Sequence, residues 1–515
     1  MNPTATLPLK SFVGPPQERL GPLGGRFGRF FRAGGTANRH LGIALLLGLS
    51  GCAAVGPDYQ APALPLPAAW SSGIASQPAE DIAEWWKRLQ DPTLDQLIAQ
   101  ALAASPDLKV AQARLREARA RRELADGARL PSVSISAAAS RAKSSKNTGS
   151  GATRDLYNAG FDASWEPDVF GATRRGSEAA QADLQASAAS LDNTRVSLVA
   201  EVARNYVELR GTQARLGIAR ANLASQSETL QLVAWRAQAG LGSSLEVEQA
   251  RTNREQTRAQ IPTLETSLAQ AEHQIALLLG EAPASLHAPL APVAAIPQVA
   301  DALAVGIPAD TLRRRPDLRA AERKLAAETA RIGVAEAARY PSFQLSGSIG
   351  LDALSVGGLF GSAELGHSLL ASVAVTLFDG GRLRSRVDIQ NAVQEQARVN
   401  YQNTLLTALR EVEDALVALA NSRQRQDALG SAATAARNAA LLARQRYSSG
   451  LIDFLTVLDS ERSQRSVEDS LATADTARAT ALIQLYKALG GGWVAPPETT
   501  DANARFLPAL QRNPS

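Results

Sequence analysis

The sequence predicts a mainly α-helical chain with a smaller β part, organised as a tandem internal repeat. Long alanine-rich stretches without proline predict the helices, and short segments in which apolar residues alternate with serine predict the strands. Residues 105–132 align without a gap with residues 315–342, and 12 of these 28 positions are identical. The same offset of 210 residues recurs later, where residues 279–280 return as 489–490.

Two copies of one unit, residues 105–280 and 315–490, are therefore expected. The remaining parts are an N-terminal segment (52–104), a linker between the copies (281–314) and a C-terminal segment (491–515). A duplication of this size favours two paired modules over a solenoid of many repeats.

Each copy is expected to contain three helices. The first, of about 23 residues, follows a Pro-Asp pair that suits a first helical turn, and it stops before Pro131 or Pro341. A helix of about 64 residues without proline comes after the β part, breaks at Gly240 or Gly450, and leads into one of about 38 residues. At about 1.5 Å per residue the long helix reaches roughly 95 Å. Because the two shorter helices together match it in length, we expect them to stack end to end beside it.

Two strands are expected in each copy, between the first and second helices. Val133 and Ile135 alternate with serines in the first copy, and Phe343, Leu345 and Ile349 alternate with polar residues in the second. A loop follows each first strand, at 142–155 in the first copy and at 357–368 in the second. The returning strand has apolar positions at Phe161, Ala163 and Trp165 in the first copy. In the second copy they are Leu369, Ala371, Val373, Val375 and Leu377.

Residues 1–51 are predicted to be a secretory signal peptide. They carry six Lys or Arg residues and one Glu, and the apolar run at 41–49 has the length of a signal core, too short to span a bilayer. The run leads into Leu49-Ser50-Gly51-Cys52, and Cys52 is the only cysteine of the chain. We expect lipidation of Cys52, as at a bacterial lipobox; the alternative is a cleavage site with an incidental cysteine. No disulfide can form within one chain.

The basic character of the chain does not indicate a nucleic-acid partner. The formal charge is +4, but outside residues 1–51 there are 48 basic and 49 acidic residues. The positive excess therefore belongs to the signal, and the net charge gives no argument for a polyanion partner such as nucleic acid.

The four strands have the length of about 10 residues and the alternation that are typical of transmembrane β-strands. Four strands in lipid would leave unpaired edges, which a bilayer does not tolerate. Several identical chains would therefore have to close a common β-barrel, with the helices forming an α-helical cylinder beyond it. The alternative is a small soluble sandwich at the end of a helical stalk.

The sequence resembles the TolC-like outer-membrane factor family, in particular its NodT/OprM-type efflux lipoproteins. The motifs that carry the resemblance are LSGC (49–52), VGPDYQAP (55–62), FDASWEPDVFGATRRG (161–176), RRRPDLRAAERKLAA (313–327) and RYSSGLIDFLTVLDSER (446–462). The resemblance implies a homotrimer with a twelve-stranded outer-membrane β-barrel, closed by trimerisation, and a periplasmic α-barrel. It also implies an equatorial belt from the segments outside the repeats, and a role as exit duct of a tripartite pump with a periplasmic adaptor and an inner-membrane transporter. The cargo would be drugs, solvents, metal ions or other small molecules.

The candidate site residues lie in the two turns between long helices. They are Gly240, Leu241, Gly242 and Ser243 in the first copy and Gly450, Leu451, Ile452 and Asp453 in the second. From the residues alone, glycine ends one helix and Ser or Asp caps the next. The resemblance implies that the turns also form a closable periplasmic aperture that meets the adaptor, where Asp453 would repeat as a ring of carboxylates. Asp459, Glu246 and Glu248 are further candidates, with solvated helix faces as the simpler interpretation.

No catalytic, cofactor-binding or metal-binding pattern is recognised, so an enzyme is not expected. His40 falls in the signal, His273 in a helix, His287 in the linker and His367 in a predicted loop, without ligand spacing. The sequence leaves three alternatives to an efflux duct open. They are the exit duct of a protein secretion system, a periplasmic coiled-coil adaptor lipoprotein and a structural stalk.

Overall fold

The computed structural model describes residues 54–62, 67, 69–71, 82–297, 312, 314–359, 361 and 365–493. Every described element belongs to one compact unit, Ala53–Ser515. The predicted signal peptide, Cys52 and most of the C-terminal segment lie outside the described residues.

The two copies of the repeat have the same order of elements. The first contains α3 (Pro106–Gly127), β1 (Ser132–Lys143), β2 (Thr153–Trp165), α4 (Ala172–Gln238) and α5 (Ser244–Leu279). The second contains α8 (Pro316–Ala337), β3 (Ser342–Ala353), β4 (Leu365–Ala374), α9 (Arg382–Ser448) and α10 (Phe454–Ala488). The corresponding helices have 22 and 22, 67 and 67, and 36 and 35 residues, which confirms the internal duplication.

Short elements accompany the repeats. They are η1 (Trp85–Leu89) and α2 (Pro92–Ala104) before the first copy, α6 (His287–Leu290) after it, and η2 (Val356–Gly358) between β3 and β4.

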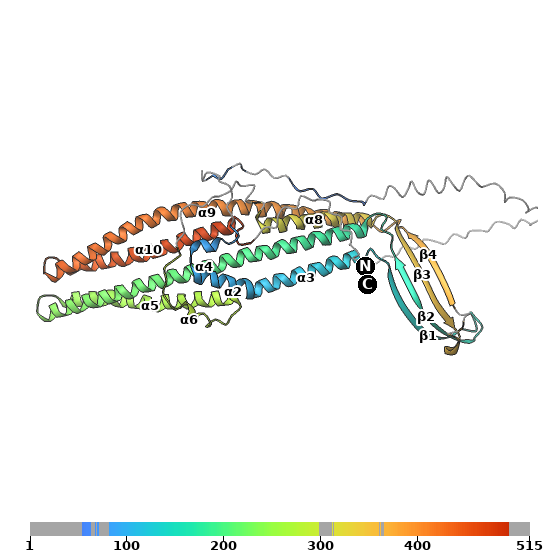
Figure 1. Ribbon diagram of the computed structural model, residues 1–515, viewed down its shortest axis with the longest axis horizontal. Helices are drawn as coiled ribbons and strands as arrows, with labels where there is room; N and C mark the ends of the chain where they lie inside the picture. The colour runs from blue at the N-terminus through green and yellow to red at the C-terminus, as the bar shows by residue number, and fades with distance from the viewer. Residues whose placement is uncertain are drawn as a thin grey trace, which may run out of the picture. The chain divides into compact units, whose positions relative to one another are not determined.

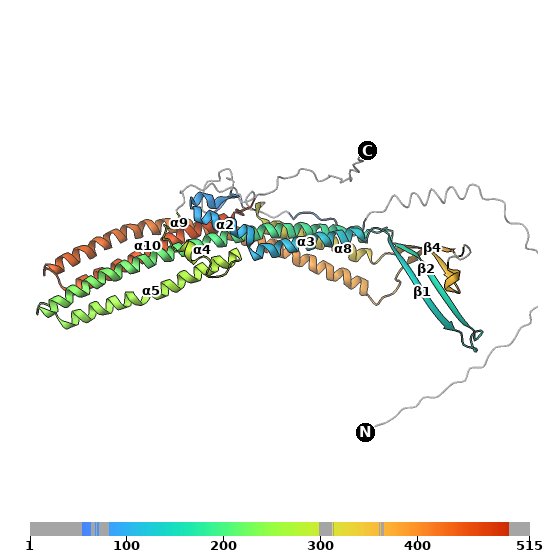
Figure 2. The same ribbon diagram turned by 60° about the horizontal axis from the view of Figure 1, so that its bottom comes forward.

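The long helices lie side by side as a curved layer. Toward the strands, neighbours pack in the order α3, α4, α8, α9, and toward the turns the order is α5, α4, α10, α9. The shorter helices thus follow one another along a long partner, as their lengths predict. Both views place the helix turns at one end and the strands beyond the other (Figures 1 and 2).

The four strands form one antiparallel sheet in the order β1-β2-β3-β4. Its register gives the sheet two chemically different faces, because side chains alternate along each strand. One cross-strand row consists of Ile135, Phe161, Ile349 and His367, and the next row, on the other face, consists of Ser134, Asp162, Ser348 and Ser368. The sheet is therefore apolar on one side and rich in hydroxyl groups on the other.

The β region departs from the sequence expectation at its boundaries. The loops are shorter than predicted, since β1 continues to Lys143 and β2 already begins at Thr153. His367, expected in a loop, lies inside β4, opposite Ile349. Val375 and Leu377 lie beyond the end of β4, because β3 starts at Ser342 and offers no partner past Ala374. Strand ends depend on the pairing partner, which periodicity does not reveal.

The largest apolar core lies about half-way along the helices. Trp85 stacks on Tyr486 with ring centroids 4.9 Å apart, and both side chains are almost completely buried. The hydroxyl of Tyr206 donates a hydrogen bond of 2.7 Å to Oδ2 of Asp91, whose other oxygen accepts from the first backbone N–H groups of α2. This core joins the N-terminal segment to α4 and α10.

No helix in the described part of the chain combines the length and the apolar character needed to cross a bilayer.

Candidate channel aperture and its supporting contacts

The two predicted turns have the same backbone geometry. Gly240 and Gly450 adopt φ values of 72° and 73°, in the left-handed region that favours glycine. In each turn the residue after the glycine donates its N–H to a carbonyl five residues earlier: Leu241 to Arg236 at 2.8 Å and Leu451 to Arg446 at 2.9 Å. This is the Schellman arrangement, and it satisfies carbonyl groups at the helix end.

The next helix begins with a polar cap in both copies. Ser243 and Glu246 form a reciprocal capping box at the start of α5. Asp453 caps α10, because its Oδ1 accepts hydrogen bonds from the hydroxyl of Thr456 at 2.6 Å and from the N–H of Thr456 at 2.9 Å. These two bonds hold the pKa of Asp453 below its ordinary value. The exposed carboxylate is therefore both a cap and a fixed negative charge.

A small apolar core connects the two turns. Its buried members are Val233, Ala250, Ala443, Tyr447, Phe454, Val457 and Leu458, with Ile452 packed against them. Arg236 donates to the carbonyl of Tyr447 at 2.8 Å, and its guanidinium lies 4.6 Å from the centre of the Tyr447 ring. The structure thus places the two predicted turns next to each other, at the end of the helical layer that lies away from the strands.

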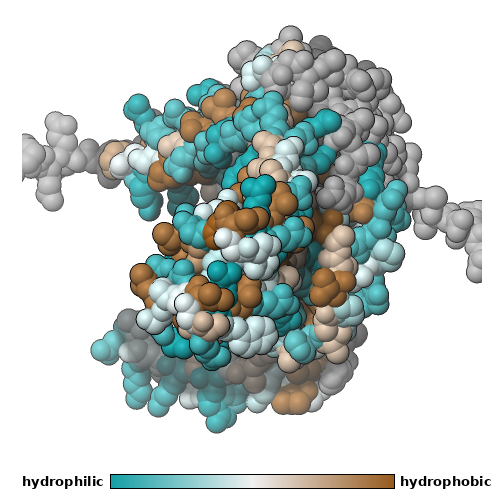
Figure 3. Space-filling model, turned by 90° about the vertical axis from the view of Figure 1, so that its left-hand side faces the viewer, coloured by the Kyte–Doolittle hydropathy of each residue, from teal (hydrophilic) through white to brown (hydrophobic). Residues whose placement is uncertain are grey.

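The tips of the turns present apolar side chains to solvent. Leu241 and Leu451 are 70% and 74% exposed, although neither has a polar group to hydrate. Leu245, Leu455 and Trp235 are also exposed nearby. The view onto this end shows apolar side chains scattered among polar ones (Figure 3). Both copies thus expose a leucine at the same place in the turn.

Behind the tips, a polar seam runs between the two helical hairpins, which are α4–α5 and α9–α10. We define the seam as Asn222, Thr229, Asn253, Glu461 and Glu468. Glu461 of α10 is 5% exposed and accepts hydrogen bonds from Thr229 of α4 at 2.6 Å and from Asn253 of α5 at 3.4 Å. Burial raises the pKa of Glu461, against the opposing effect of these contacts and of Arg444.

The second carboxylate of the seam is Glu468. Its oxygens accept from Asn222 at 3.2 Å and from Arg437 of α9 at 2.5 Å. Within the described residues, Oδ1 of Asn253 and Oε1 of the neighbouring Gln226 are buried without a hydrogen-bond partner. Sequence reasoning missed this seam, since acidic residues on long helices are usually solvated. The only signal in the sequence was the spacing of seven residues between Glu461 and Glu468 and between Asn222 and Thr229.

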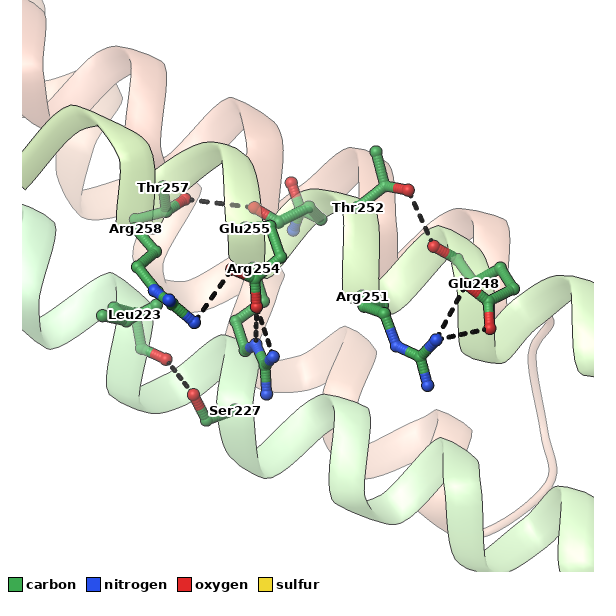
Figure 4. A network of polar contacts seen from close by, with 10 residues as sticks. Leu223, Ser227, Glu248, Arg251, Thr252, Arg254, Glu255, Thr257 and Arg258 are labelled. Atoms are coloured by element: carbon green, nitrogen blue, oxygen red, sulfur yellow. Dashed lines mark hydrogen bonds and ion pairs between the residues drawn. The ribbon is translucent and has the colours of Figure 1, made fainter.

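The exposed face of α5 differs from the seam. Arg251 pairs with Glu248 at 2.8 Å, and Glu255 accepts from Arg254 and Arg258 (Figure 4). Such exposed pairs within one helix contribute little stability. Glu248, a candidate for the aperture, is thus occupied by a local ion pair.

An N-terminal strap, residues 54–59, lies across the helices near the sheet. Arg175 of α4, which is buried, donates to the carbonyls of Val55 and Gly56, at 3.2 Å each, and to Asp58 at 2.7 Å. Gly56 crosses α8 at Gly333 so closely that a Cβ on Gly56 would come within 2.4 Å of the Gly333 Cα. The strap therefore joins α4 of the first copy to α8 of the second.

No group of three or more His, Cys, Asp or Glu side chains in the described part of the chain is arranged to hold a metal ion. His287 contacts the buried Glu272 at 3.0 Å, and no third ligand joins them in that part. In the described part of the chain, the polar clusters discussed above either cap helix ends or form hydrogen bonds between neighbouring helices.

A duplicated chain with a two-faced sheet at one end of paired long helices is the architecture of a channel-wall subunit, since the apolar face suits lipid and the hydroxyl-rich face suits water. The model of the family described as "Outer membrane efflux protein" matches residues 97–281 and 307–491, once for each copy. The chain belongs to this family. It is an outer-membrane protein whose helices extend into the periplasm, and it serves as the exit duct of an efflux system.

Relatives match over nearly the whole chain. Nodulation protein T of Rhizobium leguminosarum bv. viciae is 34% identical, over 90% of this chain and 96% of the relative. The toluene efflux pump outer membrane protein TtgF of Pseudomonas putida is 33% identical, over 88% and 97%. Among solved structures, the outer-membrane channel OprN has a TM-score of 0.80 and 38% identity, covering 85% of this chain and 99% of OprN. These matches overturn the adaptor and stalk alternatives.

Proposed function

We propose that three copies of this chain form one channel, with a twelve-stranded β-barrel in the outer membrane and a helical barrel in the periplasm. The observation that carries the proposal is the open four-stranded sheet: β1 and β4 are edge strands, and every residue of both is exposed. Unpaired backbone groups in lipid cost several kcal/mol each, so β1 of one copy must pair with β4 of another.

The helices also support closure of the layer by further copies of the chain. α3 and α9 lie at the two ends of the helical layer, and α3 buries only Leu108. Exposed apolar residues such as Leu124 on α3 and Leu406 on α9 would be covered when the layer closes on itself.

The aperture of this duct is formed by the turns at Gly240–Ser243 and Gly450–Asp453. The exposed leucines of the tips meet a periplasmic adaptor, which connects the duct to an inner-membrane transporter. Three copies of Asp453 place carboxylates around the opening, where they favour cations and disfavour anions. The duct needs no cofactor and catalyses no reaction; it exports drugs, solvents, metal ions or other small molecules from the periplasm or cytoplasm to the outside, and the transporter selects them.

Cys52 carries the lipid anchor of the mature chain. The strap, which starts two residues after it, is held beside the sheet end of α4, as expected for a segment that follows a membrane-bound residue. Membrane fractionation of Cys52→Ser tests this part. Release of the variant from the outer membrane supports a required anchor, whereas unchanged fractionation means that the barrel alone holds the protein.

The oligomeric proposal is tested on the purified full-length protein. We expect a mass of three chains in detergent, mobility that changes on heating, and discrete conductance steps in planar bilayers. A monomer in the outer-membrane fraction, or trimers that never conduct, would contradict the proposal. Restored resistance in a strain lacking its own efflux duct identifies the cargo class.

A further inference from the structure

The far end of the β1–β2 hairpin carries a cluster of positive charge. Residues 141–155 contain Arg141, Lys143, Lys146 and Arg154 against one acid, Asp155. The corresponding end of the β3–β4 hairpin, residues 352–367, contains no Lys or Arg. The positive charge is thus concentrated on one of the two hairpins.

The register places two of these cations, Arg141 and Lys143, at a defined height on the lipid-facing side. From Val133 toward the hairpin turn, the outward positions of β1 are Ile135, Ala137 and Ala139, and then Arg141 and Lys143. Eight residues separate Val133 from Arg141, which corresponds to about 27 Å of extended strand. Barrel strands tilt by about 35–45°, so along the membrane normal Arg141 lies about 20 Å and Lys143 about 25 Å from Val133, at the outer edge of an apolar band about 25 Å tall.

Aromatic residues mark the same boundaries. Trp165 and Tyr157 are both outward positions of β2, about 27 Å apart along the strand. Aromatic side chains are enriched at the two interfaces of a membrane barrel. Tyr157 pairs with Ala139, the next row on the same face after the Arg141–Asp155 pair.

The basic side chains of this hairpin differ in their contacts and in the face of the sheet to which they belong. Arg141 is engaged by Asp155, with Nε 2.6 Å from Oδ1, and keeps a 75% exposed side chain. Lys146 lies over the turn, where a Cβ on Gly151 would come within 2.7 Å of its Cγ. Arg154 pairs with Ala142 and belongs to the hydroxyl-rich face, toward the duct.

We propose that Arg141, Lys143 and Lys146 form a binding surface for the phosphate groups of the glycolipid in the outer leaflet of the outer membrane. Phosphate at this height accepts charge-assisted hydrogen bonds from the outward Arg141 and Lys143 and from Lys146 in the adjoining turn. Three copies of this hairpin would alternate around the barrel with three β3–β4 hairpins whose ends lack Lys and Arg, so the glycolipid binds in three separate sectors. The inference rests on the outward placement of the sheet in the proposed channel.

The test uses purified trimers in detergent and measures binding of bisphosphorylated lipid A and of the same lipid with its phosphates removed. We expect the parent protein to prefer the phosphorylated lipid. Lys143→Gln should weaken its binding about fivefold, and Lys143→Gln combined with Lys146→Gln about thirtyfold, since each cation near a charged membrane surface contributes a similar increment. Replacing both lysines by arginine should preserve binding.

Arg154→Gln is the matched control, because it removes one charge from the same hairpin on the opposite face. Equal losses for Arg154→Gln and Lys143→Gln would overturn the proposal, as would equal binding of both lipids by the parent. Displacement of the lipid by millimolar inorganic phosphate would identify a phosphate-ion site and would also overturn it. Conductance of each variant is recorded in parallel. Trimers that conduct but lack lipid preference refute only this inference, whereas absence of trimers refutes the channel itself.

Discussion

The hydroxyl of Thr229 on α4 donates a hydrogen bond of 2.6 Å to a carboxylate oxygen of Glu461 on α10, across the boundary between the two helical hairpins. An apolar cluster lies on the turn side of this pair, and the main core lies beyond it in the other direction. The hairpins are therefore joined by apolar contacts at both ends and by a polar seam between them.

The seam should respond to pH through Glu461. Burial raises the pKa of this carboxyl, and the groups that face it are Thr229 of α4, Asn253 of α5 and Arg444 of α9. Because the pKa is raised on folding, the protonated form fits the seam better. The stabilisation is complete below the ordinary Glu pKa and is lost as the pH rises through the raised value. We expect Glu461→Gln to increase thermal stability at pH 8, with a difference that shrinks toward pH 4.

Glu248→Gln on the exposed face of α5 is the control for this experiment and should leave the pH profile unchanged. Thr229→Val should lower the free energy of unfolding by about 1–3 kcal/mol, since it leaves a buried acceptor unsatisfied. A Glu461→Gln protein with the parent's pH profile would show that this group does not govern the seam.

Asp453 allows its charge to be separated from its capping role. Asparagine caps helices as well as aspartate, whereas alanine does not. If three carboxylates set ion preference, Asp453→Asn and Asp453→Ala should reduce cation preference equally, measured as reversal potential in planar bilayers. Because the bonds from Thr456 lower its pKa, the preference of the parent should not change between pH 5 and 8. Unchanged conductance and selectivity in Asp453→Ala would exclude a gating ring.

Gly333→Ala should detach the strap. A Cβ at this position would lie 2.7 Å from Cγ of Arg175 and 2.9 Å from the carbonyl oxygen of Val55. Such overpacking typically costs about 1–3 kcal/mol. We expect faster proteolysis within the strap, residues 54–59, and a lower melting temperature. Gly430→Ala, in the middle of α9 with open space around it, should be neutral or slightly stabilising; equal behaviour of the two variants would refute the tight crossing.

Tyr206→Phe isolates one polar contact of the main core. The substitution keeps the buried ring and removes only the hydroxyl that donates to Asp91. We expect a loss of about 1–2 kcal/mol in the free energy of unfolding, measured by denaturant titration, since the acceptor is a charged group that stays partly buried. A loss much larger than this would mean that the hydroxyl also holds α2 in position.

The sequence determined the architecture in outline. Proline and glycine positions mark where helices begin and end, and the period of two marks the strands, because these signals are local. The offset of 210 residues determined the duplication, and the Gly-Leu pairs at 240 and 450 located the turns. Strand boundaries such as those of β4 were wrong, since a strand ends where its partner ends.

The tertiary structure decided which local signals meet. Glu461 and Glu468 look like ordinary charged helix residues in the sequence, and only the packing of α10 against α4 buries them. Gly333 and Arg175 acquire a role only where residues 54–59 cross them. These pairs are separated by more than 100 residues, and their contacts arise from the lateral order of the helices. Periodicity along the chain does not encode that order, which is why it had to come from the fold.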